Sequence, residues 1–185
     1  DIITTNTYAS CNHNLQAMGL GDETEQLNTL AVHLAKEAVE TAAVDKKVWI
    51  AGSLSSFGVY NVSRGDRNLP PISVIEDNYK SQAYLLAEAG VDFILLEMVR
   101  ESEHGSLLLK AAEATGLPVW VGVSCSVNEQ GDVKMLSTNT VTGASDLDCS
   151  DTLGKLMSIG GSLLAIMHTE IEQTTAALQV ALKKW

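Results

Sequence analysis

Short apolar runs alternate with longer amphipathic segments along this chain. Five runs predict β-strands, because about four to eight apolar residues between turn signals are typical of buried strands; they cover residues 2–8, 48–54, 91–96, 119–124 and 163–167. Segments with the helical period of apolar residues lie between and after them; these cover residues 22–39, 73–89, 102–115, 152–159 and 169–184. The alternation predicts an α/β fold with a parallel sheet.

Local signals set the predicted helix ends. Capping boxes at Asp22 to Glu25, Ser73 to Glu76 and Thr169 to Glu172 predict three helix starts, since each pairs a short polar residue with Glu three positions later. Gly90 is placed to end the second helix in a left-handed conformation.

The connections differ at the two ends of the predicted strands. Those from helix to strand are very short, whereas two from strand to helix, residues 55–72 and 126–146, are roughly 18 and roughly 20 residues long. Loops of that length inside a compact domain are often functional. We therefore expect the active face at the carboxyl ends of the strands.

Polar or reactive residues close all five apolar runs. They are Thr5 to Tyr8, Gly52 and Ser53, Glu97, Ser124 and Cys125, and Met167 and His168. Because parallel α/β folds bind ligands at the carboxyl ends of their strands, these residues are the candidates for chemistry.

Composition limits the partners. A net charge of -11 argues against a nucleic-acid backbone or an anionic membrane surface as the main partner, and no apolar stretch approaches the roughly 20 residues that span a bilayer. The three cysteines, Cys11, Cys125 and Cys149, do not form a disulfide framework, which favours a reduced, cytoplasmic setting.

Two architectures fit five strand–helix units. A doubly wound open sheet would use all 185 residues, whereas a (βα)8 barrel needs about 250 residues and would lack about three units here. The start at Asp1 within a strand and the end at Trp185 directly after a helix favour a barrel fragment.

Four segments resemble motifs of the homocysteine S-methyltransferase family. They are DIITTNTYAS at residues 1–10, AGSL at 51–54, YLLAEAGVDFILLEM at 84–98 and LPVWVGVSC at 117–125. They follow one another in the family's order over nearly the whole chain, and together they are specific. The resemblance implies a TIM-type (βα)8 barrel, in which residues 1–185 form a single domain holding units two to six.

Glu97 is the main candidate for substrate binding. A carboxylate at the end of a buried strand is costly unless it meets a cation or several donors. From the residues alone, an ion pair with Arg100 explains Glu97 equally well. The resemblance implies instead that Glu97 binds the amino group of homocysteine.

Asn6, Thr7, Tyr8 and Ser53 complete the predicted substrate site. Asn is a poor strand former, so Asn6 predicts a polar contact, whereas Thr7 and Tyr8 are also ordinary strand formers. In some zinc-containing family members the tyrosine that matches Tyr8 approaches the metal when substrate is absent. Ser53 either donates to a substrate carboxylate or serves as a turn former.

His168 is the predicted catalytic residue and the single metal candidate. The family keeps a zinc-binding cysteine at this place and a Cys-Cys pair far downstream, and this chain has neither. Histidine binds zinc, but one ligand does not make a site. The resemblance therefore leaves three alternatives: His168 is a base or hydrogen-bond partner without zinc, ligands come from outside this chain, or the protein is inactive.

The remaining reactive side chains are interpreted as structural. Cys125 has no base or positive field beside it in the sequence that would lower its thiol pKa, so we expect it to pack in the core. His13, His33 and His104 have no metal-site spacing, and we expect surface or packing roles for His33 and His104.

Three functions are weighed. The first is transfer of a methyl group to the thiol of homocysteine or a related thiol, from a donor that the sequence does not identify. The second is a degenerate, zinc-free member that binds a small molecule or a partner without turnover. The third, an unrelated α/β protein with an open sheet, is the least favoured. A five-unit fragment also has unpaired sheet edges, which predicts completion by further chain or by association, including into a homo-oligomer.

Overall fold

The computed structural model describes residues 1–42, 45–59, 70–137 and 143–184. A large sheet contains five strands: β1 (Ile2–Thr4), β2 (Trp49–Ser55), β3 (Phe93–Val99), β4 (Val119–Val123) and β8 (Leu163–Ile166). A small sheet contains three: β5 (Cys125–Val127), β6 (Val133–Leu136) and β7 (Ala144–Asp148). The helices are α1 (Asn12–Gln16), the 3-10 helix η1 (Gly21–Glu23), α2 (Thr24–Ala42), α3 (Ile72–Ala89), α4 (Ser102–Glu113), α5 (Cys149–Met157) and α6 (Ile171–Lys184).

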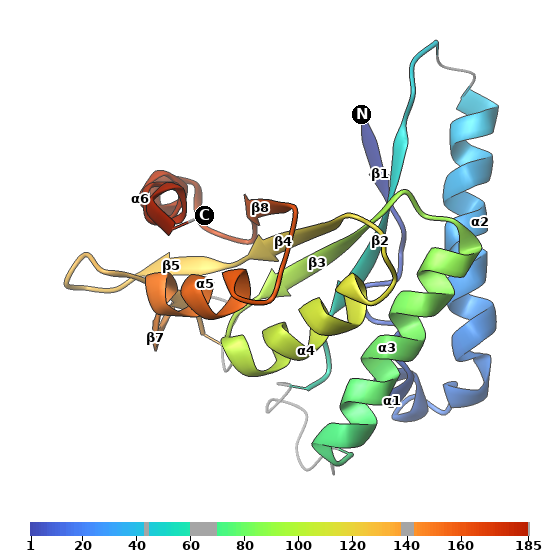
Figure 1. Cartoon of the computed structure of the whole chain (residues 1–185), viewed down its shortest axis with the longest axis horizontal. Helices are drawn as coiled ribbons and strands as arrows, with labels where there is room; N and C mark the ends of the chain where they lie inside the picture. Colours follow the sequence, from blue (N-terminus) through green and yellow to red (C-terminus); the bar gives the residue numbers. More distant parts are fainter. Residues whose placement is uncertain (43–44, 60–69, 138–142, 185) are drawn as a thin grey trace.

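The large sheet is parallel, with its strands side by side in the order β1-β2-β3-β4-β8 (Figure 1). This confirms the predicted α/β fold. In the described part of the chain the sheet has two edge strands, β1 and β8, and does not close on itself. The strand order follows the chain order, which differs from the reversal of order in doubly wound sheets.

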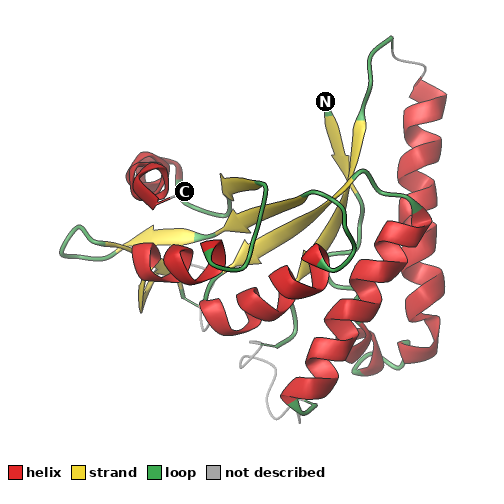
Figure 2. Cartoon of the chain, viewed as in Figure 1, coloured by secondary structure: helices red, strands yellow, loops and turns green. Residues whose placement is uncertain are grey.

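One face of the sheet holds the core. Its side chains include Ile50, Leu54, Ile94, Leu96 and Val121, all buried, and they pack with apolar residues of α2, α3, α4 and α5. Figure 2 shows the helices α2, α3 and α4 running along the sheet. Burial of this apolar surface is the main stabilising term for the fold.

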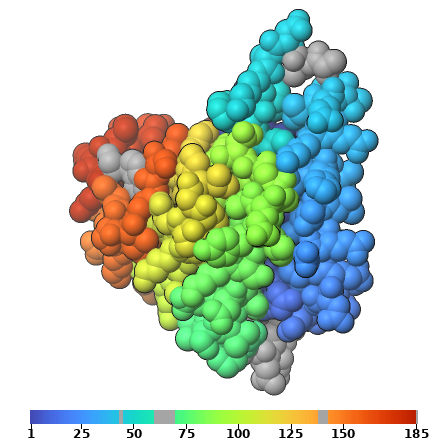
Figure 3. Space-filling model, turned by 45° about the vertical axis from the view of Figure 1, so that its right-hand side comes forward, coloured from blue at the N-terminus to red at the C-terminus, as the bar shows by residue number. Residues whose placement is uncertain are grey.

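The opposite face is only partly covered. The strand register places Ala51, Ser53 and Ser55 beside Phe93, Leu95 and Glu97 on this face. Its outer parts are open, because Ile2, Trp49 and Leu163 are 46%, 45% and 37% exposed. The space-filling view in Figure 3 shows the successive strand–helix units as adjacent bands of colour across the molecule.

Several predicted boundaries are wrong. The first strand ends at Thr4 instead of Tyr8, because the chain turns there to make side-chain hydrogen bonds. The helix predicted from Asp22 begins at Thr24, after η1. Pro71, without a side-chain cap, precedes α3 in place of a Ser73 capping box. Gly90 does end α3, with φ of 87°.

The prediction of an irregular loop for the second long connection is wrong as well. Residues 126–146, predicted to be irregular, contribute most of the antiparallel sheet β5-β6-β7. Of the first connection, residues 60–69 lie outside the described residues. Within the described ranges, no helix combines the length and the apolar character needed to cross a membrane.

Candidate functional site

The carboxyl edge of the sheet brings Tyr8, Glu97 and Arg100 into one neighbourhood. Glu97 lies opposite Ser55 in the register of β2 and β3. The Ser55 hydroxyl donates to the carbonyl oxygen of Tyr8 at 2.6 Å, which fixes the segment after β1 against the end of β2. Burial raises the pKa of Tyr8 above its ordinary value; Arg100 opposes this and the Glu97 carboxylate adds to it.

Two methionines, Met98 and Met167, lie beside Tyr8 at this edge. The Tyr8 hydroxyl donates to Sδ of Met98 at 3.2 Å, and the backbone N–H of Met98 donates to Sδ of Met167 at 3.3 Å. Met98 has φ of 59°, in the left-handed region, and the β3–β4 register shifts between Leu96 and Val99. A non-glycine residue at this φ stores backbone strain of the kind that gathers at functional sites.

Gly122 leaves the space that Met167 occupies. A Cβ atom at this position would lie 2.6 Å from Sδ of Met167 and 2.8 Å from the carbonyl oxygen of Leu96. The side chain of Met167 therefore reaches over β4 towards Met98. The thioethers of Met98 and Met167 give this edge a soft, polarisable lining.

Ser53 has a hydroxyl available for a ligand. Its backbone N–H donates to Oγ1 of Thr5 at 3.1 Å and its carbonyl accepts from Oγ1 of Thr7 at 2.7 Å. Its own Oγ is buried and makes no hydrogen bond within the described residues. A buried hydroxyl without a partner is costly, so Ser53 is suited to donate to a bound group.

Thr7 is used inside the protein. It is fully buried, and its hydroxyl also lies 2.8 Å from Oγ1 of Thr5. Behind it, the side chain of Gln82 donates to the Thr7 carbonyl, to Oγ of Ser10 and to Oδ1 of Asn28 at 2.9, 3.2 and 3.1 Å. Asn28 in turn donates to the Ser10 carbonyl at 2.9 Å. This buried network, from α2 and α3, fixes the backbone that carries Tyr8.

Glu97 is half-buried and does not pair with Arg100. Within the described residues, Glu97 takes part in no hydrogen bond and no ion pair. A guanidinium nitrogen of Arg100 donates instead to the carbonyl of Ser137 at 3.0 Å. The ion pair that was an equal explanation of Glu97 is therefore not formed, and the carboxylate is left for another partner.

Asn6 lies away from this group. Its side chain is exposed and makes no hydrogen bond within the described part. It borders an apolar groove of about 550 Å³ between β1 and α2, lined by Ile3, Leu27, Leu30 and Leu34 among others. The polar contact predicted for Asn6 is not present among these residues.

His168 is exposed at the end of β8, with φ of 46°. The turn is held by Thr169, whose hydroxyl donates to the Met167 carbonyl at 3.1 Å and accepts from the backbone N–H of Cys125 at 3.0 Å. Across the described ranges, no three side chains of His, Cys, Asp or Glu come together as a metal site would need. The donors present therefore do not fit a zinc ion at His168, which needs about four ligands.

The remaining histidines take structural places. His104 is buried on α4, with Nδ1 3.4 Å from the hydroxyl of Tyr79, and burial lowers its pKa. His13 is buried with its ring edge-on to Tyr79, at 5.7 Å between ring centroids. His33 is exposed on α2. Of these three histidines, His33 is the one on the surface.

The sequence does not single out two of the site residues: Met98 resembles an ordinary apolar residue, and Gln82 a polar position on a helix. Met167 is predicted at the end of the last apolar run, but without its contact to Met98. The spacing does not reveal the role of Met98. Since side chains alternate along a strand, Met98 is expected on the face opposite to Glu97, the face that the helices cover. The left-handed φ that turns it towards Tyr8 depends on the tertiary structure.

Comparisons with protein families and with solved structures both find homocysteine methyltransferases. The family model described as homocysteine S-methyltransferase matches residues 1–160. Among solved structures, the homocysteine methyltransferase MmuM from Escherichia coli in its metallated form has a TM-score of 0.56 at 16% identity, covering 100% of this chain and 79% of that chain. Its oxidised form gives 0.54 at 16% identity, with 100% and 79% covered. Its apo form gives 0.50 at 14% identity, with 100% and 80% covered. Identities this low show a shared fold. No curated protein matches the chain.

Proposed function

Because the chain belongs to the homocysteine S-methyltransferase family, we propose that it transfers a methyl group to the thiol of homocysteine or a related thiol amino acid. The observation that carries the proposal is the carboxyl edge, where a Glu97 carboxylate without a protein partner lies near Tyr8 and on the same sheet face as the unpaired Ser53 hydroxyl. An amino acid offers a matching ammonium and carboxylate.

Each of these residues has a proposed role. Glu97 binds the substrate ammonium, in a charge-assisted hydrogen bond of the stronger kind. Ser53 donates to the substrate carboxylate. Tyr8 covers the site from the end of β1, in a position set by Thr7 and by the network behind it, while Asn6 stays a predicted binding residue at the rim of the groove. The soft sulfur atoms of Met98 and Met167 line the place of the thiol.

The reaction is an in-line displacement. The substrate thiolate attacks a methyl group carried on a sulfonium, ammonium or folate nitrogen, and the donor leaves with the bonding electron pair. A thiol with a pKa of about 8.5 is mostly protonated at pH 7, so it needs activation. His168 is the proposed base that accepts this proton; no step is assigned to zinc, since the described donors do not fit it.

The alternative is a member that binds without catalysis. It is favoured by His168 in place of the family's zinc cysteine and by the lack of gathered metal donors in the described residues. In that case Glu97 and Ser53 would still hold an amino acid, but the thiol would not be activated. Binding and turnover therefore have to be measured separately.

We propose further that residues 1–185 are one domain of TIM-barrel type with five βα units. The strand order and the helices on one face support this. Two surfaces would then be covered by further units or by a second copy: the partly covered sheet face that carries Ser53 and Glu97, and the groove beside β1. A cytoplasmic location and the absence of nucleic-acid and membrane partners are part of the same proposal.

The test is methylation of homocysteine by purified protein with each of the three donor classes, with methionine measured by mass spectrometry. Glu97→Gln is expected to weaken homocysteine binding about 10- to 100-fold. Glu88→Gln, an exposed carboxylate near the end of α3, is the matched control. Zinc content is measured on the same sample: stoichiometric zinc with methionine formation would overturn the non-catalytic alternative. Homocysteine binding that does not respond to Glu97→Gln would contradict the proposed site.

A further inference from the structure

Two of the three cysteines lie side by side in the tertiary structure. Sγ of Cys125 on β5 and Sγ of Cys149 at the start of α5 are 3.5 Å apart, although 24 positions separate them in the chain. Both side chains are free thiols and are buried, at 1% and 0% exposure. Cys11 is equally buried but has no thiol beside it within the described residues. Cys125 and Cys149 therefore differ from an ordinary buried cysteine.

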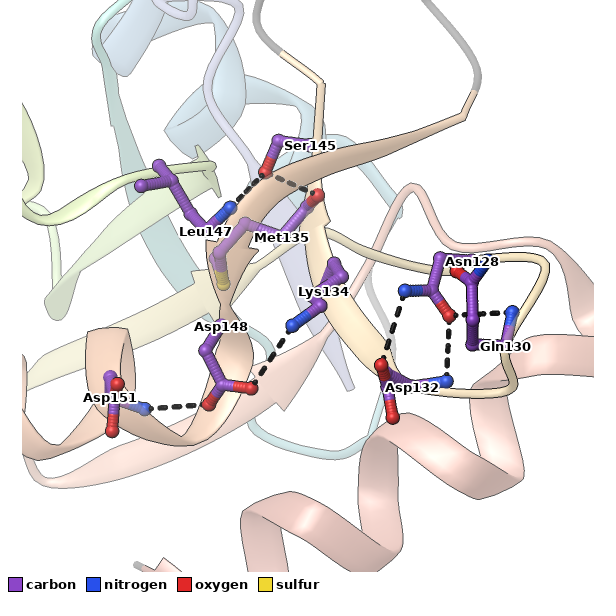
Figure 4. A network of polar contacts seen from close by, with 9 residues as sticks. All are labelled: Asn128, Gln130, Asp132, Lys134, Met135, Ser145, Leu147, Asp148 and Asp151. Atoms are coloured by element: carbon purple, nitrogen blue, oxygen red, sulfur yellow. Dashed lines mark hydrogen bonds and ion pairs between the residues drawn. The ribbon is translucent and has the colours of Figure 1, made fainter.

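Contacts on both sides fix the two segments that carry the cysteines. Met135, opposite Cys125 in the β5–β6 register, is fully buried beside it. Asp148, directly before Cys149, accepts the backbone N–H of Asp151 and so caps α5. The same carboxylate pairs with Lys134 of β6 at 3.5 Å. Figure 4 shows Asp148 between Lys134 and Asp151, with Ser145 bonded to the Met135 carbonyl on the neighbouring strand.

We propose that Cys125 and Cys149 are an oxidisable dithiol, which a peroxide converts into a disulfide that joins β5 to α5. A disulfide needs its sulfur atoms about 2 Å apart, so they have to approach each other by about 1.5 Å. This is within the reach of side-chain rotation and a small shift of the helix start. The bond closes the segment that contains β6 and β7 into a loop.

The two thiols have different roles in the oxidation. The hydrogen bond from Cys125 lowers the pKa of Cys149, against burial and the Asp148 charge, and the start of α5 also favours a thiolate there. The Cys149 thiolate attacks one peroxide oxygen, forming a sulfenic acid and releasing the other oxygen as hydroxide. The Cys125 sulfur then attacks the Cys149 sulfur, and the sulfenic oxygen leaves as water with the Cys125 proton. In sum, two thiols and one hydrogen peroxide give one disulfide and two waters.

The pair is next to the proposed substrate edge. The backbone N–H of Cys125 donates to the hydroxyl of Thr169, which follows His168. The backbone that carries the Cys125 sulfur is thus hydrogen-bonded to the turn that carries the proposed base. The dithiol itself does not depend on the proposed function, because it rests on the arrangement of the two sulfur atoms.

The experiment uses the purified, reduced full chain, treated with hydrogen peroxide while folded. Thiols counted with a maleimide after denaturation are expected to fall from three to one, and peptide mapping without reductant is expected to join the peptides of Cys125 and Cys149. In Cys11→Ser the count should fall from two to none, with the same joined peptides. Cys125→Ser is expected to leave a sulfenic acid at Cys149 that dimedone traps, and Cys149→Ser to leave none.

Three results would overturn the proposal: three thiols remaining after treatment of the folded protein, a disulfide that includes Cys11, or equal rates of bond formation in the folded protein and in urea. The last would mean that folding does not bring the sulfur atoms together. Peptide mapping of the wild type decides the question even if a serine variant fails to fold.

Discussion

The carboxyl ends of the first and last strands of the large sheet are held in different ways. After β1, the segment of Thr5 to Ser10 is tied to β2, α2 and α3 by a buried network of side-chain hydrogen bonds centred on Gln82 and Asn28. After β8, His168 is exposed, and Thr169 is the described residue that ties its turn to β5.

This difference indicates a division of labour at the proposed site. The first end fixes backbone geometry before a ligand arrives, which lowers the cost of binding. The second end carries the proposed base on a turn with little support and a strained φ of 46°. Under the proposed function, the well-supported end positions Tyr8 beside the substrate, and the lightly held end carries the base that would activate the thiol.

The largest effect is expected from Gln82→Leu, which removes the centre of the first network. Its amide donates to three buried acceptors, although its own oxygen has no partner within the described residues. Loss of these bonds should destabilise the fold by about 2–3 kcal/mol, measured by urea unfolding. Gln179→Leu on the exposed side of α6 is the control. A Gln82→Leu protein as stable as the control would show that the network does not hold this end.

Gly122→Ala tests the support of the other end. The new methyl group would meet Met167 and the backbone carbonyl of Leu96, so a cost of about 2 kcal/mol is expected from overpacking. Gly154→Ala is the matched comparison, because among the described residues an added Cβ there would meet no atom within 4 Å beyond its own stretch of α5. It should instead gain up to about 1 kcal/mol in helix propensity. Thermal unfolding of both proteins distinguishes them; equal shifts would contradict the packing of Met167 over Gly122.

Thr169→Val removes the tie between β8 and β5 while keeping the side-chain shape. The buried N–H of Cys125 loses its acceptor, which should cost about 1 kcal/mol and speed amide exchange at Cys125. Thr174→Val, whose hydroxyl donates to the exposed carbonyl of Glu170 just before α6 at 3.0 Å, serves as control. If amide exchange at Cys125 is unchanged, the hydroxyl is not what holds this turn.

The smallest effect is a pH dependence of the unfolding free energy that comes from His104. This residue lies on α4 beside Tyr79 of α3. Burial lowers its folded pKa below the ordinary 6.5, so the unfolded chain takes up the proton first. Its contribution is complete above about pH 6.5 and is lost as the pH falls below that value. The loss should stay under about 1 kcal/mol, and His104→Gln should flatten it. Urea midpoints between pH 7.5 and 5.5 measure this, with the exposed His33→Gln as control; parallel profiles for all three proteins would contradict it.

Much of the architecture follows from sequence. The period of apolar residues predicts the five parallel strands and the five main helices, because burial of one face is a local pattern. Gly90 predicts the end of α3, since a left-handed residue after a helix favours glycine. The ends of β1 and the starts of α2 and α3 are predicted less well, because capping depends on contacts that distant residues supply.

The candidate site divides in the same way. The position of Glu97 near the carboxyl end of β3 is predictable, since this charged residue follows an apolar run, although β3 itself continues to Val99. The antiparallel sheet in residues 126–146 is not, because its strands are short and only partly buried.

By itself, the sequence determined the strand–helix alternation, the edge that carries the polar residues and the family. The tertiary structure decided which of those residues meet: Tyr8 with Met98, Met98 with Met167, and Cys125 with Cys149. Such pairs are far apart along the chain. They depend on strand register, on the left-handed turn at Met98 and on the space that Gly122 leaves, and no local pattern of residues encodes these.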